Sequence, residues 1–168
     1  LFGKTNGTAI YRITDPTDPV YVGEIPNDAA QLIWHDIKID DDYAYIVSES
    51  PTHGLKVFDL QRLRALGPAP VTPFPLIADS TYELEGTSHN VVVNEDTDRA
   101  YLVGSGQVLG MGGVCTTAEG DPTDAGLHIL DIRNPLVPRF AGCYVEDGYI
   151  HDAQCVVYDG PDVEHRGR

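Results

Sequence analysis

The sequence predicts an all-β fold made of β-propeller blades, each a sheet of four antiparallel strands, in an incomplete ring of about three blades. Two observations lead to this prediction. Short β-branched and aromatic runs alternate with Asp, Asn, Gly and Pro clusters, and four kinds of strand segment recur in a fixed order along the 168 residues. Repeated four-stranded units with variable loops are typical of propeller blades. A β-sandwich is the alternative, but a sandwich does not repeat a whole four-stranded unit.

The first kind of segment carries a His followed by Asp or Asn, and then alternating apolar residues. Its copies are WHDIKI at 34–39, SHNVVV at 88–93 and IHDAQCV at 150–156. The second kind follows an acidic turn, because Asp and Asn favour the dihedral angles of tight hairpins. Its copies are YAYIV at 43–47 and RAYLV at 99–103, whose tyrosines we expect in the core.

The third kind of segment begins with Gly and ends on a polar turn. Its copies are GTAIYRITDP at 7–16, GLKVFDLQR at 54–62 and GLHILDIRNP at 126–135. The fourth kind is an outer strand, with copies VYVGEIP at 20–26, TYELEG at 81–86 and PRFAGCYVED at 138–147. One helical turn is predicted from Asp59 to Leu66, closed by Gly67 and Pro68.

The order of these segments divides the chain into parts of four blades. We expect the end of one blade at 1–30, a second blade at 31–87, a third at 88–148 and the start of a fourth at 149–168. Such a row leaves unpaired sheet edges, which invite further strands. The sequence is therefore either a piece of a longer propeller or a chain that meets other protein chains at those edges.

The composition excludes several classes of partner. Lys and Arg number 11 against 26 Asp and Glu, so the net charge is −15. That charge argues against nucleic acid and against anionic membranes. Hydrophobic residues make up 42% of the chain, which is enough for a core, and no apolar run approaches the roughly 20 residues of a membrane span. We recognise no signal peptide, and its absence says little, since a trimmed chain would also lack one.

The main candidate site is the repeated pair at the start of the first kind of segment. It comprises His35, Asp36, His89, Asn90, His151 and Asp152. In a propeller these innermost strands all run beside the central channel, so the pairs converge at its mouth. Imidazole with carboxylate suits a transition metal, whereas oxygen ligands suit calcium. The alternative is that the pairs tie neighbouring blades together by hydrogen bonds, as repeat proteins do. Adjacent strand residues face opposite sides, so His and Asp cannot both point inward without a bulge.

The stretches quoted above, together with YIHDAQCVVYDGPD at 149–162, resemble bacterial surface proteins of the choice-of-anchor B family, whose blades are similar to LVIVD repeats. The resemblance covers most of the chain outside its two long loops. It implies an exported, cell-surface β-propeller without an established enzymatic activity, of which this chain is the N-terminal part.

Three cysteines and one sequon bear on the compartment. Cys115 lies in the long loop of the third predicted blade and Cys143 in its outer strand, so a disulfide between them would fasten that loop to its own blade. The family resemblance places the partner of Cys155 beyond residue 168. Reduced, buried thiols in a cytosolic protein are the alternative. Asn6 opens an Asn-Gly-Thr glycosylation sequon.

These observations predict an extracellular or cell-surface binding or interaction module, with a divalent metal at the channel mouth as an open option. Two alternatives remain. The first is a metal-dependent enzyme that uses the His–Asp residues, although no nucleophile elbow or triad is recognisable. The second is a structural subunit that assembles through its open edges into an oligomer or a fibre.

Overall fold

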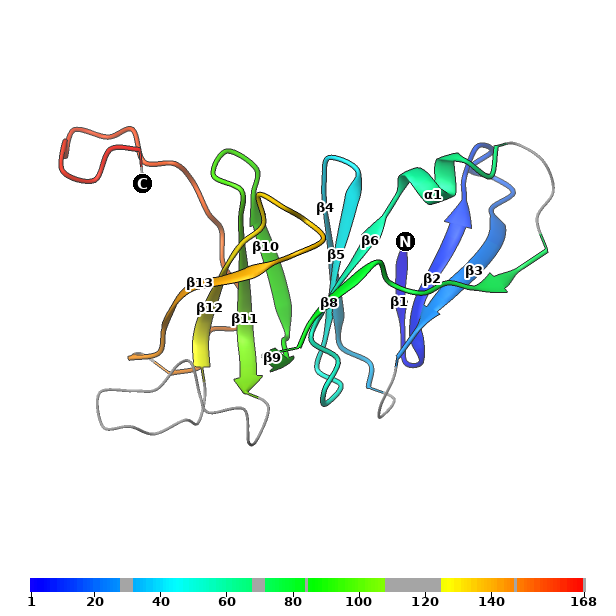
Figure 1. Cartoon of the computed structure of the whole chain (residues 1–168), viewed down its shortest axis with the longest axis horizontal. Coiled ribbons are helices and arrows are strands. Elements are labelled where there is room, and N and C mark those ends of the chain that lie inside the picture. Colours follow the sequence, from blue (N-terminus) through cyan, green and yellow to red (C-terminus); the bar gives the residue numbers. More distant parts are fainter. Residues whose placement is uncertain (28–31, 68–71, 84, 108–124, 147, 168) are drawn as a thin grey trace.

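The computed structural model describes residues 1–27, 32–67, 72–83, 85–107, 125–146 and 148–167. These residues form three β-sheets and one short helix (Figure 1). The β-rich fold built on four-stranded sheets is confirmed. Within the described residues, no helix is long and apolar enough to cross a membrane.

The first sheet has the strand order β1-β2-β3-β7. Its strands are β1 (Phe2–Lys4), β2 (Gly7–Arg12), β3 (Val20–Pro26) and β7 (Phe74–Pro75). The strands β1, β2 and β3 are antiparallel, whereas β7 pairs with β3 in parallel. The sequence had predicted only β2 and β3 here.

The second and third sheets repeat one meander. The second has the order β4-β5-β6-β8, and the third has the order β10-β11-β12-β13, with β9 also pairing with β11. Their strands are β4 (His35–Asp40), β5 (Tyr43–Ser48), β6 (Leu55–Asp59), β8 (Ser80–Tyr82), β9 (Glu85–Thr87), β10 (Asn90–Asn94), β11 (Arg99–Gln107), β12 (Ala125–Asp131) and β13 (Arg139–Tyr144). These are the four predicted kinds of segment in the predicted order.

The acidic turns have the backbone geometry that the sequence suggested. Asp41 and Asp98 lie at positive φ, 48° and 50°, in the hairpins β4–β5 and β10–β11. Aspartate tolerates this left-handed conformation better than most residues. After β6 the predicted helical turn forms as α1 (Gln61–Arg64), and Gly67 follows it with a φ of 61°.

The second sheet is packed on both faces. Ala44, Ile46 and Phe58 point toward the first sheet, where they share one core cluster with Ile10 and Val22. Their strand neighbours point the opposite way because side chains alternate along a strand. This second cluster joins the second sheet to the third through Tyr45, Val47, Leu55, Val57, Tyr82, Val91, Ala100, Leu102, Leu130 and Ile132. Burial on both faces explains the continuous apolar run of β5.

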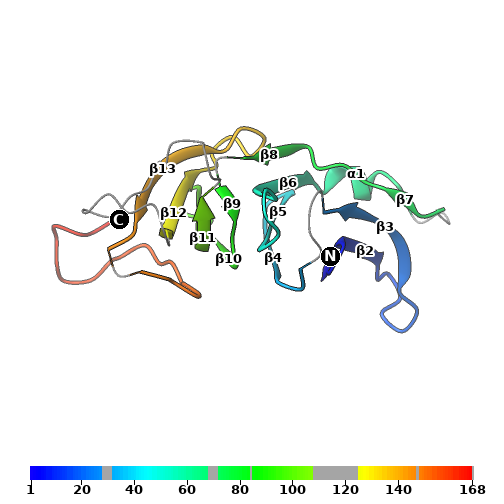
Figure 2. The ribbon, with the colours of Figure 1, turned by 90° about the horizontal axis from the view of Figure 1, so that it is seen from below.

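The three sheets therefore pack face to face in a row. Figure 2 shows that the row is bent, with β4 and β10 near one side and β8 and β13 near the opposite side. The described residues do not close this row into a ring, and the propeller arrangement itself stays a prediction.

Two predicted strands differ from the structure. The segment TYELEG contributes to two short strands, β8 and β9, which pair with different sheets. The segment at 150–156 forms no strand, although its sequence repeats that of β4 and β10. A strand needs a neighbour to accept and donate its backbone hydrogen bonds, and no described strand pairs with this segment.

Candidate functional site

The predicted His–Asp pairs lie where the first strands of the sheets begin. His35 and Asp36 open β4, His89 immediately precedes β10, and Asn90 opens that strand. His151 and Asp152 lie in the extended tail that follows the third sheet. The structure thus places the first two pairs at equivalent positions of the second and third sheets, whereas the third pair lies outside any strand.

Asp36 and Asn90 are engaged between neighbouring units. The Val91 amide of the third sheet donates a hydrogen bond to Asp36 Oδ2 at 3.1 Å. Asn90 Nδ2 in turn donates to the carbonyl oxygen of His151 at 3.1 Å. Asp36 thus reaches from β4 to the third sheet, and Asn90 reaches from β10 to the tail that follows that sheet. These bonds fit the second interpretation of the repeated pairs, in which they tie neighbouring units together by hydrogen bonds.

The remaining contacts of Asp36 are local. Lys38 Nζ lies 2.6 Å from Asp36 Oδ2, and the Ile37 amide donates to Asp36 Oδ1 at 2.8 Å. Both carboxylate oxygens are therefore occupied by protein donors. Asp152 is exposed, and its Oδ1 accepts a bond from the Ala153 amide at 2.8 Å.

The three histidines do not converge on one point. The rings of His89 and His151 are close, with centroids 4.2 Å apart and planes inclined by 51°. His35 lies elsewhere: its Nε2 is 3.0 Å from Asn27 Nδ2, and its ring meets His53 edge-on at 6.1 Å. Burial lowers the pKa of His35 below its ordinary value.

The predicted metal site is not assembled by these residues. Among the residues that the structure describes, no group of three or more His, Cys, Asp or Glu side chains is placed to hold a metal ion. The physical reason is that Asp36 and Asn90 bind neighbouring backbone, while His35 turns toward Asn27. A protein metal site needs three or four convergent ligands, and here two imidazoles meet.

His89 is instead the centre of an aromatic cluster. Its Nδ1 lies 2.6 Å from Glu49 Oε1, and because a carboxylate only accepts, the ring N–H is the donor. The Trp34 ring centroid lies 5.6 Å from that of His89 on one side, and Tyr149 lies 6.4 Å from His151 on the other. We call Trp34, His89, His151 and Tyr149 the aromatic row.

A glycine makes room for the aromatic row. Gly104 on β11 has a φ of 58°, and a Cβ there would lie 2.6 Å from the Tyr149 hydroxyl and 2.7 Å from His89 Cβ. Any larger residue would force these two rings apart. Trp34 and Tyr149 nevertheless remain 52% and 54% exposed, so the row presents two large rings to solvent.

Sequence reasoning found the two histidines of this cluster but missed Trp34, Glu49, Tyr149 and Gly104. A signal was present for two of them, since Trp34 stands directly before His35 and Tyr149 stands two residues before His151. No sequence signal links Glu49 to His89, because they are 40 residues apart and meet only through sheet packing.

Two further histidines lie in the core of the molecule. His53 is 2% exposed and His128 is fully buried. The Tyr82 hydroxyl on β8 lies 3.0 Å from His128 Nε2 on β12, so this pair joins the second sheet to the third. Desolvation lowers the pKa of His128 to about 4.

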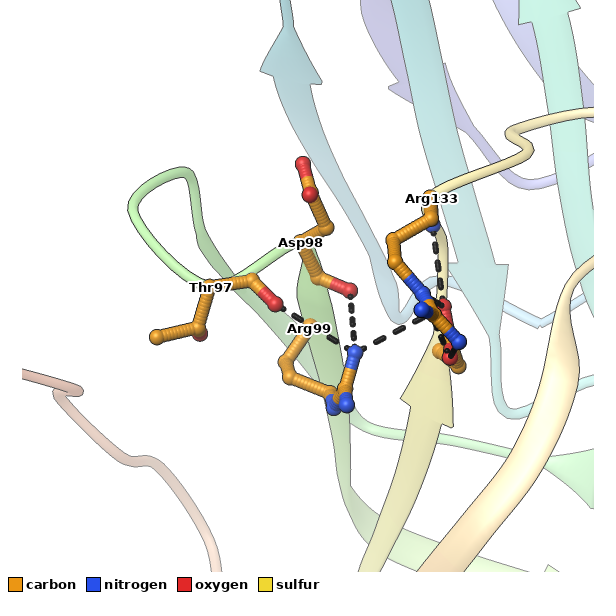
Figure 3. A network of polar contacts seen from close by, with 5 residues as sticks. Thr97, Asp98, Arg99 and Arg133 are labelled. Carbon is orange, nitrogen blue, oxygen red and sulfur yellow. Dashed lines mark hydrogen bonds and ion pairs between the residues drawn. The ribbon is translucent and has the colours of Figure 1, made fainter.

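A charged network lies at the opposite end of β11 and β12 (Figure 3). Arg133 binds Asp131 with Nη2 2.5 Å from Oδ2, and Arg99 approaches the same carboxylate at 3.5 Å. Arg133 lowers the pKa of Asp131 to about 2. Arg99 also donates to the carbonyls of Thr97 and Asp98. These bonds fix the β10–β11 turn against the end of β12.

The remaining predicted residues give separate results. Cys143 lies on β13 and is disulfide-bonded, while its predicted partner Cys115 lies outside the described residues. Cys155 is a free thiol, and burial raises its pKa. Asn6 lies in the β1–β2 turn, where its Nδ2 donates to Glu24 Oε1 at 3.4 Å. Its glycosylation stays a prediction.

Comparison of the chain with protein-family models, with curated proteins and with solved structures finds no match.

Proposed function

We propose that this chain is part of a β-propeller outside the cell, on a cell surface, and that it acts as a binding or interaction module. The fold supports the proposal because three sheets follow one another face to face in a bent row, two of them with the same meander. The resemblance of its repeats to choice-of-anchor B surface proteins agrees with it.

The exposed aromatic row is the observation that carries the binding role. Trp34 and Tyr149 each keep about half of their surface in solvent, and they flank two imidazoles, His89 immediately before β10 and His151 in the tail after the third sheet. Tryptophan and tyrosine are enriched at binding interfaces, since they bury a large area at a small cost in conformational entropy. Glu49 holds His89 in one orientation, so the surface is preorganised.

The metal-dependent enzyme is less well supported. Metal-assisted catalysis needs a held ion with an open coordination position and a positioned base. In the part of the chain that the structure describes, Asp36 and Asp152 accept hydrogen bonds from backbone amides, and no group of three or more metal ligands is found. Among the described residues, no contact favours this alternative over binding.

The binding role can be tested with the chain immobilised on a sensor surface and a soluble extract of bacterial cell envelope as the probe. We expect retained material, and at least a tenfold weaker response for Trp34→Ser and for Tyr149→Ser. Val163→Ser is the matched control, because Val163 is 73% exposed and outside the row. Retention no greater than on a bare surface, or equal retention by all variants, would contradict the proposal.

A further inference from the structure

Trp34 and Glu49 form a cross-strand pair on one face of the second sheet. The Glu49 amide donates a hydrogen bond to the Trp34 carbonyl oxygen at 3.2 Å, which extends the antiparallel ladder of β4 and β5 by one pair. Residues that lie directly opposite each other in such a ladder point to the same face of the sheet. The backbone of two strands therefore holds the indole ring and the carboxylate side by side.

His89 fixes the carboxylate of this pair. Its Nδ1 lies 2.6 Å from Glu49 Oε1, and its ring centroid lies 5.6 Å from that of Trp34. Among the residues that the structure describes, no donor is found on the other carboxylate oxygen, Glu49 Oε2. The Glu49 side chain is 30% exposed and Trp34 is 52% exposed. An oriented negative charge thus lies beside a half-exposed ring, and both can be reached from solvent.

The chemistry of this surface favours a flat organic cation. The face of an indole ring attracts a cation more strongly than that of any other aromatic side chain. A carboxylate oxygen accepts hydrogen bonds and pairs with a positive charge. A guanidinium satisfies both groups at once, because it stacks on a ring with its flat face and donates N–H groups from its edge. The compact ammonium group of lysine has no flat face to stack on the ring.

The chain contains the same arrangement elsewhere, with a guanidinium in place. Arg62 Cζ lies 4.8 Å from the centroid of the Phe58 ring, and Arg62 Nη1 lies 2.8 Å from Asp79 Oδ1. One guanidinium there covers an aromatic ring and pairs with a carboxylate. Trp34 and Glu49 supply the same two groups, and no arginine or lysine among the described residues is paired with Glu49.

We infer that Trp34 and Glu49 bind the guanidinium of an arginine side chain from a basic partner protein. The cation lies over the exposed face of the Trp34 ring and donates to Glu49 Oε2, while His89 keeps the carboxylate in place. The net charge of the chain, −15, attracts a basic partner and repels an acidic one. This inference rests on the binding role proposed above and names the group that the aromatic row recognises.

Trp34 is the one tryptophan of the sequence, so its fluorescence reports binding at this site directly. The probe is a Gly-Arg-Gly peptide with blocked ends, titrated into the chain in about 0.15 M salt. The comparison is the same peptide with citrulline, whose side chain has the shape of arginine without the charge. We expect a saturable fluorescence change with half-saturation at about 1–10 mM, and at least tenfold weaker binding of the citrulline peptide. Equal binding of the two peptides, or no response to either, would overturn the inference.

Two further probes separate the shape and the source of the ligand from its charge. A Gly-Lys-Gly peptide carries the same charge on a compact ammonium group, and it should bind at least threefold more weakly than the arginine peptide. Free arginine carries an α-carboxylate, which Glu49 and the net charge repel, so it should bind more weakly as well. Equal binding of lysine would show that the site reads charge alone. Equal or tighter binding of free arginine would indicate a small-molecule ligand, and either result would contradict the proposal.

Glu49→Gln locates the contact. The amide keeps the size of the side chain, and its carbonyl oxygen can still accept from His89, but the charge is lost. The arginine peptide should therefore bind at least fivefold more weakly. Glu95→Gln is the matched control, because it removes the same charge from an exposed position in the β10–β11 turn. Equal losses in the two variants would refute the contact, because the net charge alone would then attract the probe.

These titrations are separable from the test of the binding role. Retention of cell-envelope material that depends on Trp34, without binding of the arginine peptide, would overturn this inference and leave the binding role intact. Loss of both responses would remove the binding role as well.

Discussion

His128 is held in its neutral form by the sheets around it. It is fully buried, it meets the Tyr82 hydroxyl at 3.0 Å, and the Phe140 ring lies 5.1 Å away. A neutral imidazole fits this site, whereas an imidazolium would lose its hydration there. His128 is therefore a core residue whose protonation state is coupled to folding.

The stability of the fold should depend on pH through His128. Its pKa is 6.5 in the ordinary state and about 4 in the folded chain, so between these values the unfolded chain binds more protons. Stability is then fully present above pH 6.5 and is lost as the pH falls toward 4, by about 3 kcal/mol at most. His128→Gln should flatten this part of the curve, measured by urea unfolding at each pH.

The control for this experiment is Tyr82→Phe, which removes the hydroxyl but leaves the imidazole buried. Its curve should keep the steep acid limb. Parallel curves for the unmodified chain and for His128→Gln would show that His128 does not cause the pH dependence.

At the scale of elements, side chains at the first strands hold the sheets together. The Asp36 carboxylate accepts the Val91 amide across the boundary between two sheets, and Val91 is fully buried. A buried amide without an acceptor costs about 1–3 kcal/mol. Asp36→Ala should therefore lower the free energy of unfolding by that amount, as measured with denaturant.

Lys38→Ala provides the comparison. It removes the other partner of Asp36, but the Lys38 side chain is 45% exposed, and exposed ion pairs contribute less than about 1 kcal/mol. If Lys38→Ala were as destabilising as Asp36→Ala, the contact between sheets would not be the reason for the effect.

The strands of the second and third sheets could be predicted because their repeats carry local signals, namely alternation, acidic turns and starting glycines. Three elements could not. The strand β1 has three residues, too few for a period to be visible, and β7 has two. The 150–156 segment has a strand sequence without a strand, since pairing depends on a neighbour that sequence alone does not reveal.

The candidate site was also predictable only in part from the sequence. The repeat predicted which histidines recur. It also suggested that the pairs could form hydrogen bonds between neighbouring units, a role that the bonds of Asp36 and Asn90 support. Side-chain direction was not predictable, because it depends on packing between sheets. His35 and His89 occupy the same repeat position, yet one meets Asn27 and the other Glu49.

At the scale of the whole molecule, the charge opposes compactness. The chain carries −15 on 168 residues, and burial together with Asp41, Glu95 and Asp98 raises the pKa of Asp40. Like charges repel more strongly at low ionic strength, where the Debye length is about 30 Å at 0.01 M and about 8 Å at 0.15 M.

Added sodium chloride should therefore stabilise this protein. Between 0.01 and 0.15 M salt we expect the melting temperature to rise by roughly 2–4 °C, as for a gain of about 1 kcal/mol in a domain of this size. Calorimetry at constant pH measures this change. A melting temperature that falls with salt would mean that attractive ion pairs outweigh the net repulsion.

The second sheet is covered on both faces by the other two sheets, and this should determine the order in which parts of the molecule unfold locally. A solenoid-like row is stabilised by nearest neighbours, so its ends fray before its middle. The amides of β5, which lie between two paired strands and beneath two layers of side chains, should exchange with deuterium last. Those of β3 and β13 should exchange earlier, and the tail first. Uniform protection across the three sheets would instead indicate that the row opens as a single cooperative unit.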